Sequence, residues 1–113
     1  MIDLELTEDQ KAVEQMVKDW AGTEVAPKIH DLDRAHRFER GFLKGMGDLH
    51  LLGVCIPEEL GGAGMDYVSL GLACEELEYV DTHLCVIMFV HVGFNFMTLW
   101  CCGSLEQKRK FLL

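Results

Sequence analysis

The sequence predicts an all-α fold, an irregular or orthogonal bundle of about five to six helices. Apolar residues recur at helical spacing, and no segment shows the alternation of a strand. Helix-start signatures occur at several points along the chain. Half of the 113 residues are apolar and 26% are charged, a balance that supplies a packed core. We therefore expect one helical domain over residues 1–113.

The first two helices are predicted from a capping signature and a proline. Residues 7–10, Thr-Glu-Asp-Gln, fit a capping box, in which the Thr hydroxyl and the Gln amide satisfy free backbone groups. An apolar stripe at helical spacing follows and comprises Val13, Met16, Val17 and Trp20. The first helix is expected to reach about Thr23. Pro27 suits the first turn of a second helix, which would run to about Ala35.

A third helix is expected over about residues 39–51, with Gly53 as its left-handed cap. Residues 57–64 hold one proline and three glycines and therefore predict a loop. Asp66 and Ser69 mark the start of the next helix, which reaches about Val80.

The C-terminal part is predicted to hold a long apolar helix and a short basic one. Asp81 or Thr82 is expected to cap the long helix, which runs to Cys102. Residues 104–107, Ser-Leu-Glu-Gln, repeat the capping-box pattern and begin the basic helix.

Charge and cysteine content exclude several classes of partner. The chain has 19 acidic and 10 basic residues, a formal net charge of −9, which argues against nucleic-acid binding and against docking on an anionic membrane. Five cysteines without a Cys-x-x-Cys pair fit neither a disulfide framework nor a zinc site. The five histidines form no ligand pair, so no metal site is expected. Together with an N-terminus that lacks a signal pattern, these features predict a cytoplasmic protein.

Residues 84–102 carry no Asp, Glu, Lys or Arg, and their length approaches that of a membrane-spanning helix. Two interpretations are open: a helix sandwiched between layers of protein, or a small membrane protein anchored by this segment. The polar or small residues His91, Gly93, Asn95 and Thr98 interrupt the segment. They favour burial in protein.

Spacing alone names no active site. The glycines at 61, 62 and 64 follow no predicted strand and precede no Gly-Lys-Ser/Thr, which favours a structural turn over a phosphate-binding loop. The carboxylates Glu75, Glu76 and Glu78 are typical of a solvated helix face. No nucleophile–base combination has a recognisable local signature.

The order of five segments, however, resembles the N-terminal helical domain of the flavin-dependent acyl-CoA dehydrogenases. Residues 57–67 are similar to the family string Pro-Glu-Glu-Tyr-Gly-Gly-x-Gly-x-Asp-Tyr, with Leu60 in place of its tyrosine. Residues 6–10, 75–82, 90–91 and 103–108 resemble further family segments at family spacing. The resemblance covers essentially the whole chain.

The resemblance implies an enzyme of three regions, of which this chain is the first. In that family, FAD lies between a middle β-domain and a C-terminal helical domain. A glutamate of the C-terminal domain removes the α-proton of an acyl-CoA thioester while the β-hydride passes to the flavin. Electrons leave to an electron-transferring flavoprotein, and the enzyme is usually a homotetramer.

Neither the flavin site nor the catalytic base has a counterpart in these 113 residues. We therefore expect no catalytic residue in this chain, no bound FAD and no activity of the isolated chain, which would be a fragment of a longer enzyme. A non-catalytic helical interaction module derived from the same fold is the alternative.

By resemblance, this domain contributes to subunit contacts, and the start of its long apolar helix forms one wall of the acyl pocket. Family members line the pocket with residues that match Cys85, Val86 and Phe89 and, further along, Val92 or Gly93. Cys85, Phe89 and Val92 are spaced for one helix face. Members that act on dicarboxylic acyl-CoAs place an arginine at the position of Cys85, because a buried carboxylate without a cation is costly. We therefore predict an uncharged acyl-CoA, and the bulky Phe89 favours a short, branched or cyclic one.

Overall fold

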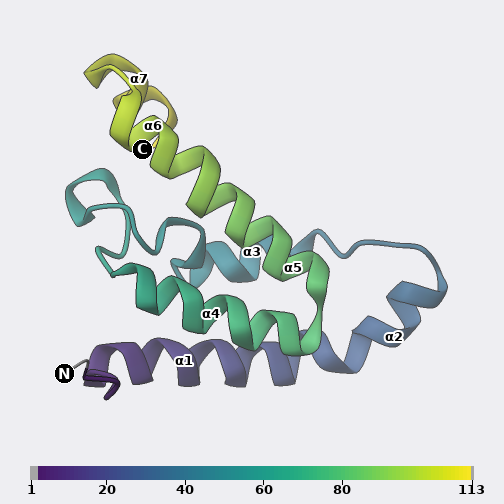
Figure 1. Ribbon diagram of the computed structural model, residues 1–113. Coiled ribbons are helices and arrows are strands. Elements are labelled where there is room, and N and C mark those ends of the chain that lie inside the picture. Colours follow the sequence, from purple (N-terminus) through teal and green to yellow (C-terminus); the bar gives the residue numbers. More distant parts are fainter. Residues whose placement is uncertain (1–2, 113) are drawn as a thin grey trace.

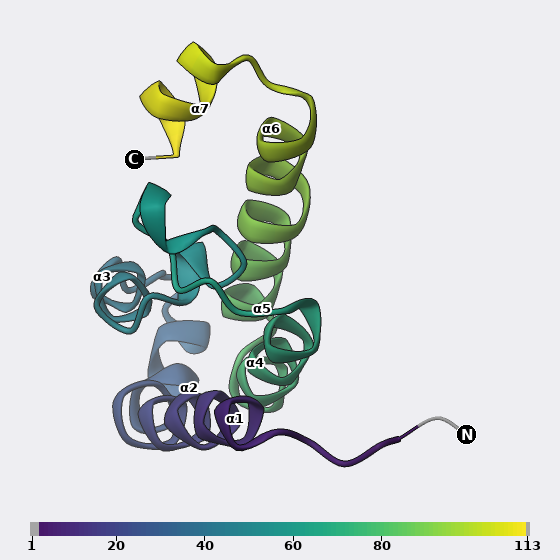
Figure 2. The same ribbon diagram turned by 90° about the vertical axis from the view of Figure 1, so that its left-hand side faces the viewer.

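The computed structural model describes residues 3–112, and the regular secondary structure of this part of the chain is all helical, without a strand (Figures 1 and 2). The predicted all-α class is therefore confirmed. The helical segments in chain order are α1 (Glu8–Trp20), the π-helical η1 (Ala21–Val25), α2 (Ala26–Arg34), α3 (Gly41–Asp48), the 3₁₀ turns η2 (Leu51–Gly53) and η3 (Glu58–Leu60), α4 (Tyr67–Val80), α5 (Thr82–Met88), the π-helical η4 (Phe89–Phe96), α6 (Met97–Cys102) and α7 (Leu105–Phe111).

The first two predicted helices are not separated by a break in the structure. The capping box at Thr7 forms as expected: the backbone N–H of Gln10 donates to Thr7 Oγ1 at 3.2 Å. The helix then continues through the wider π-turn η1 directly into α2. Pro27 lies in the first turn of α2, the position predicted for it. The helix bends at this point but does not end (Figure 1).

The third helix is shorter than predicted, and its left-handed residue is His50 with φ 58°, not Gly53. α3 ends at Asp48, and the His50 amide closes the last turn on the Gly47 carbonyl at 2.9 Å. Histidine is one of the side chains that tolerate this backbone region. Gly53 lies within η2 instead, so the predicted glycine cap is wrong.

α1 and α4 lie side by side and run in the same direction (Figures 1 and 2). The Gln10 side-chain amide of α1 donates to Asp66 Oδ2 at 2.8 Å, and Asp66 is the N-cap of α4. Asp66 Oδ1 also accepts from the Ser69 backbone N–H at 2.8 Å. This residue therefore caps one helix and fastens it to the other.

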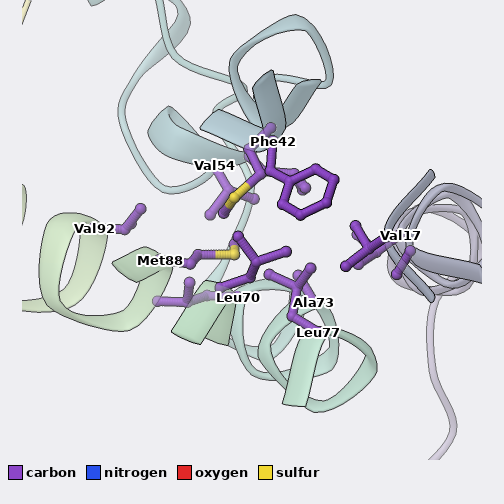
Figure 3. Close-up of a cluster of buried hydrophobic side chains, with 13 residues drawn as sticks. Val17, Phe42, Val54, Leu70, Ala73, Leu77, Met88 and Val92 are labelled. Carbon is purple, nitrogen blue, oxygen red and sulfur yellow. The ribbon is translucent and has the colours of Figure 1, made fainter. Parts of the chain in front are cut away.

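The core lies where α1, α3, α4 and the long C-terminal rod meet (Figure 3). Apolar side chains from all four face one another there. The labelled members in Figure 3 are Val17, Phe42, Val54, Leu70, Ala73, Leu77, Met88 and Val92. The shared core explains how segments distant in sequence form one domain.

α5, η4 and α6 form one continuous rod, Thr82–Cys102, which we call the long rod. It rises from the end of α4 and carries α7 at its far end (Figures 1 and 2). Its core-facing residues Leu84, Met88 and Val92 are fully buried. A second capping box at Ser104 starts α7, as predicted.

Candidate functional site

The start of the long rod is fixed by Asp81, one of the two caps predicted for it. Asp81 is buried, and its side chain accepts from the His83 backbone N–H at 3.3 Å and contacts His83 Nδ1 at 3.1 Å. The Thr82 hydroxyl donates to Glu78 Oε1 of α4 at 2.9 Å. These bonds hold the first turn of the rod, where the predicted site residues begin, against α4.

The predicted site residues do not share one helix face. Val92 is fully buried in the core, whereas Phe89 is 48% exposed and Val86 is 49% exposed. The buried face of the rod is formed by Leu84, Met88 and Val92. The predicted common face of Cys85, Phe89 and Val92 is therefore wrong. From Phe89 onward the helix is π-helical and wider, so the α-helical spacing no longer applies.

Cys85 lies between the core and the exposed side of the rod, beside Cys74 and Glu78 of α4. Burial raises the pKa of Cys85 to about 12, and the neighbouring Glu78 carboxylate and Cys74 thiol add to the rise. Burial likewise raises the pKa of Cys74. Cys85 is therefore a neutral thiol near pH 7 and offers an uncharged, weakly polar surface.

Every exposed residue of the long rod between Val86 and Phe94 is apolar. These residues, which we call the outer face, are Val86, Phe89, Val90 and Phe94. The rings of Phe89 and Phe94 meet edge to face with centroids 5.0 Å apart. Gly93 lies next to them, and a Cβ there would stand 3.8 Å from Phe89 Cδ2. The outer face is thus an apolar surface that includes two of the predicted site residues.

The glycine-rich loop has the structure of a turn, the interpretation favoured by its spacing. Gly61 and Gly64 adopt positive φ, and a Cβ at Gly62 would overlap the carbonyl oxygen of Ile56. The five backbone N–H groups of residues 61–65 all donate to backbone carbonyls of residues 53–58. None of these five N–H groups is left for a phosphate.

Two features near the far end of the long rod escaped sequence reasoning. His91 stacks on Phe96 with ring centroids 4.1 Å apart, and burial lowers its pKa. A groove also lies between this end of the rod and α7. The only sequence signal was the polar interruption at His91 and Asn95, which does not encode the π-helix that arranges them.

By length and composition, the long rod would be able to cross a membrane: its most apolar window has a mean hydropathy of 1.8, and 17% of that window is buried. One side of the rod packs into the core through Leu84 and Met88. We expected the long rod to be buried between layers of protein, but only one of its faces is buried in the described part of the chain. Within residues 3–112 no cluster of His, Cys, Asp or Glu is placed to hold a metal ion.

Comparison with known proteins places this architecture in one family. Residues 7–113 match the family model described as the acyl-CoA dehydrogenase N-terminal domain. The chain is 36% identical over 109 residues to the mitochondrial short-chain specific acyl-CoA dehydrogenase of Mus musculus, covering 96% of this chain and 26% of that protein. It is 36% identical over 112 residues to the short-chain specific acyl-CoA dehydrogenase of Clostridium acetobutylicum, covering 99% of this chain and 30% of that protein.

Solved structures give the same result. Butyryl-CoA dehydrogenase from Megasphaera elsdenii superposes with a TM-score of 0.93 at 26% identity, over 98% of this chain and 30% of that one. A chain from the structure described as the electron transferring flavoprotein of Acidaminococcus fermentans gives a TM-score of 0.94 at 36% identity, over 98% of this chain and 29% of that one. The chain thus spans less than a third of the length of these relatives. With its family model matched over residues 7–113, it belongs to the acyl-CoA dehydrogenase N-terminal domain family.

Proposed function

We propose that this chain serves as the N-terminal helical domain of an FAD-dependent acyl-CoA dehydrogenase and supplies one wall of the acyl pocket. The reaction is the α,β-dehydrogenation of an acyl-CoA thioester. The observation that carries the proposal is the outer face of the long rod. Val86 and Phe89 are apolar and half exposed, and the opposite side of their helix is packed in the core of a domain of this family.

The role of these side chains is to bind an acyl chain and exclude water from it. Val86 and Phe89 present apolar surface, and Phe94 braces the Phe89 ring edge to face. The neutral Cys85 thiol adds no charge to this wall. Val92 points into the core, so we assign it to positioning the helix. A dry pocket of this kind strengthens the electrostatic interactions at the reacting carbons.

The substrate that fits this wall is an uncharged acyl-CoA with a short, branched or cyclic acyl group. A terminal carboxylate has no cation partner at Cys85, and Phe89 fills space that a long chain needs. The relatives described as short-chain specific and as a butyryl-CoA dehydrogenase act on substrates of this size class.

FAD belongs to this proposal as the hydride acceptor that other regions of the enzyme would bind. The glycine-rich loop does not fit the pyrophosphate of FAD, because the N–H groups of residues 61–65 are already bonded to backbone carbonyls. An electron-transferring flavoprotein as electron acceptor and a homotetrameric assembly complete the proposal. The exposed Val90 is available for subunit contacts.

A chimera tests the assignment directly. This chain would replace the corresponding N-terminal region of the Clostridium acetobutylicum short-chain specific acyl-CoA dehydrogenase, to which it is 36% identical. We expect a yellow, active enzyme that prefers short acyl-CoAs. Phe89→Ala in the chimera should shift the kcat/KM optimum toward longer acyl chains, because it removes bulk from the pocket.

The matched control is Phe111→Ala, which removes another half-exposed phenylalanine, on α7. An unchanged chain-length profile for Phe89→Ala, or an equal shift for Phe111→Ala, would refute the pocket wall. The isolated 113-residue chain should purify colourless and show no oxidation of acyl-CoA with an artificial electron acceptor. Stoichiometric FAD on the isolated chain would contradict the division of roles.

A further inference from the structure

The π-helix η4 holds two pairs of rings with the same spacing along the chain. Phe89 and Phe94 meet edge to face, with ring centroids 5.0 Å apart and ring planes at 75°. The ring centroids of His91 and Phe96 lie 4.1 Å apart. In each pair the second ring comes five residues after the first, which is the spacing of the π-helical hydrogen bond. The two ring pairs therefore follow from the π-helical backbone.

An α-helix would not form the pair of Phe89 and Phe94. With 3.6 residues per turn, residues five apart lie about 140° from each other around an α-helix axis. The α-helical neighbours of Phe89 would be Val92 and Gly93, three and four residues further along. Val92 is fully buried in the core, and Gly93 has no side chain. Phe89 thus has an aromatic neighbour on the outer face because η4 is π-helical.

Phe94 restrains the position of the Phe89 ring. Side chains on a helix lean toward its N-terminus, so Phe94 leans back over Phe89 from the following turn. Phe89 is half exposed, and Gly93 beside it leaves space, because even a Cβ there would stand 3.8 Å from Phe89 Cδ2. Without the Phe94 ring, the Phe89 side chain would be free to change rotamer toward the vacated space.

We propose that Phe94 is a positioning residue for acyl-chain length, which holds the Phe89 ring where that ring limits the depth of the acyl pocket. The inference rests on the pocket wall proposed above and adds a residue that acts through Phe89. Loss of the Phe94 ring lets Phe89 turn aside, so that a longer acyl chain fits.

The contact between the rings is measured first in the 113-residue chain, without any reaction. Phe94→Leu removes the ring and keeps an apolar side chain. Combined with Phe89→Ala in a double-mutant cycle of urea unfolding, it should show a coupling of about two- to fivefold in the unfolding equilibrium constant. The matched control is Phe96→Leu, which breaks the other ring pair of η4 and should be additive with Phe89→Ala.

The effect on specificity is measured in the chimera described above, as the ratio of kcat/KM for octanoyl-CoA to kcat/KM for butyryl-CoA. Phe94→Leu should raise this ratio at least about threefold. Phe94→Tyr keeps the ring and should restore the ratio of the unsubstituted chimera, and Phe96→Leu should leave it unchanged. In the Phe89→Ala background, Phe94→Leu should add no further shift, because the ring that it positions is gone. A merely structural role would lower both kcat/KM values alike and leave their ratio constant.

The outcomes separate the positioning role from the pocket wall. If Phe89→Ala shifts the ratio and Phe94→Leu does not, the positioning role is overturned and the wall stands. Additive shifts of these two variants overturn it as well, because Phe94 would then contact the acyl chain by itself. An equal shift for Phe96→Leu would mean that η4 changes as a whole, which also contradicts the proposal. If Phe89→Ala leaves the ratio unchanged, the wall and the positioning role are both overturned, even where the unfolding cycle shows the ring contact.

Discussion

The α1–α4 pair and the long rod are both helical and both contribute to the core, but they differ in what faces solvent. α1 and α4 bury Val17, Leu70, Ala73 and Leu77 and carry polar side chains on much of their outer surface. The long rod buries Leu84, Met88 and Val92 and is apolar on its outer face as well. One stripe of apolar residues suffices to fasten a helix to a core. The second apolar face of the long rod is not needed for the packing of this domain, and we propose that it makes contacts outside it.

The largest loss of stability is expected at Gly62, where the structure leaves no space for a side chain. Gly62→Ala should lower the free energy of unfolding by more than about 3 kcal/mol, since its Cβ meets the carbonyl of Ile56, which cannot move independently. The matched change on the long rod, Gly93→Ala, meets only Phe89 at ordinary contact distance and should be tolerated. Urea denaturation of the two variants measures the difference. Equal losses would erase the contrast between the two regions.

Adjacent residues on the long rod provide the next comparison. Met88→Ala should cost about 2–3 kcal/mol of unfolding free energy, because its fully buried side chain leaves a cavity. Phe89→Ala removes a larger but half-exposed side chain and should cost less than about 1 kcal/mol. Thermal and urea unfolding report both values. If Phe89→Ala were the more destabilising, the outer face would be part of the core.

The polar fastening of α1 to α4 should contribute less than the core contacts. Asp66→Ala removes the cap of α4 and the partner of Gln10 and should cost about 2 kcal/mol. The hydrogen bonds from the Ser69 backbone N–H, the Gln10 side chain and the Ser69 hydroxyl hold the pKa of Asp66 below its usual range. Its contribution is therefore fully present above the unfolded-state pKa near 4 and is lost as pH falls through the folded-state value.

Unfolding free energies measured between about pH 6 and pH 2 test this dependence. The wild type should lose more stability than Asp66→Asn over the acid part of the range, because asparagine keeps an acceptor for the cap but does not titrate. Parallel curves for the two proteins would show that the carboxylate does not stabilise the fold.

The reactivity of the cysteines should also distinguish the buried from the exposed parts of the molecule. Cys101 and Cys102 are exposed near the end of the long rod, whereas burial raises the pKa values of Cys55 to about 11 and Cys85 to about 12. Pulsed alkylation at pH 7.5, followed by peptide mass spectrometry, should label Cys101 and Cys102 at least about tenfold faster. Unfolding in urea is the control and should equalise the rates. Rapid labelling of Cys85 in the folded chain would mean that the α4–α5 contact opens.

The sequence was sufficient for features encoded by a few neighbouring residues. The capping boxes at Thr7 and Ser104 and the caps at Asp66 and Asp81 require only side chains within three residues of the groups they satisfy. The glycine-rich turn was predictable for the same reason, since positive φ and close backbone approach select glycine locally. The family emerged from the order of such segments along the chain.

The candidate site was only partly predictable. The predicted long helix correctly includes Val86 and Phe89, and Asp81 caps its start. Spacing failed at Val92, because a π-helix changes which residues share a face and is not encoded by an apolar pattern. Their role in an acyl pocket remains a prediction.

By itself, the sequence determined an acidic, all-α domain with its helix starts and its family, because these depend on local hydrogen bonding and on residue order. Only the tertiary structure decided which face of each helix is buried. Burial depends on contacts among α1, α3, α4 and the long rod, which are distant in sequence. The helix α3 ends at Asp48, and the left-handed His50 leads directly to the buried Leu51, which local sequence preference for glycine did not predict. The outer face and the groove under α7 are the surfaces left over when that packing is complete.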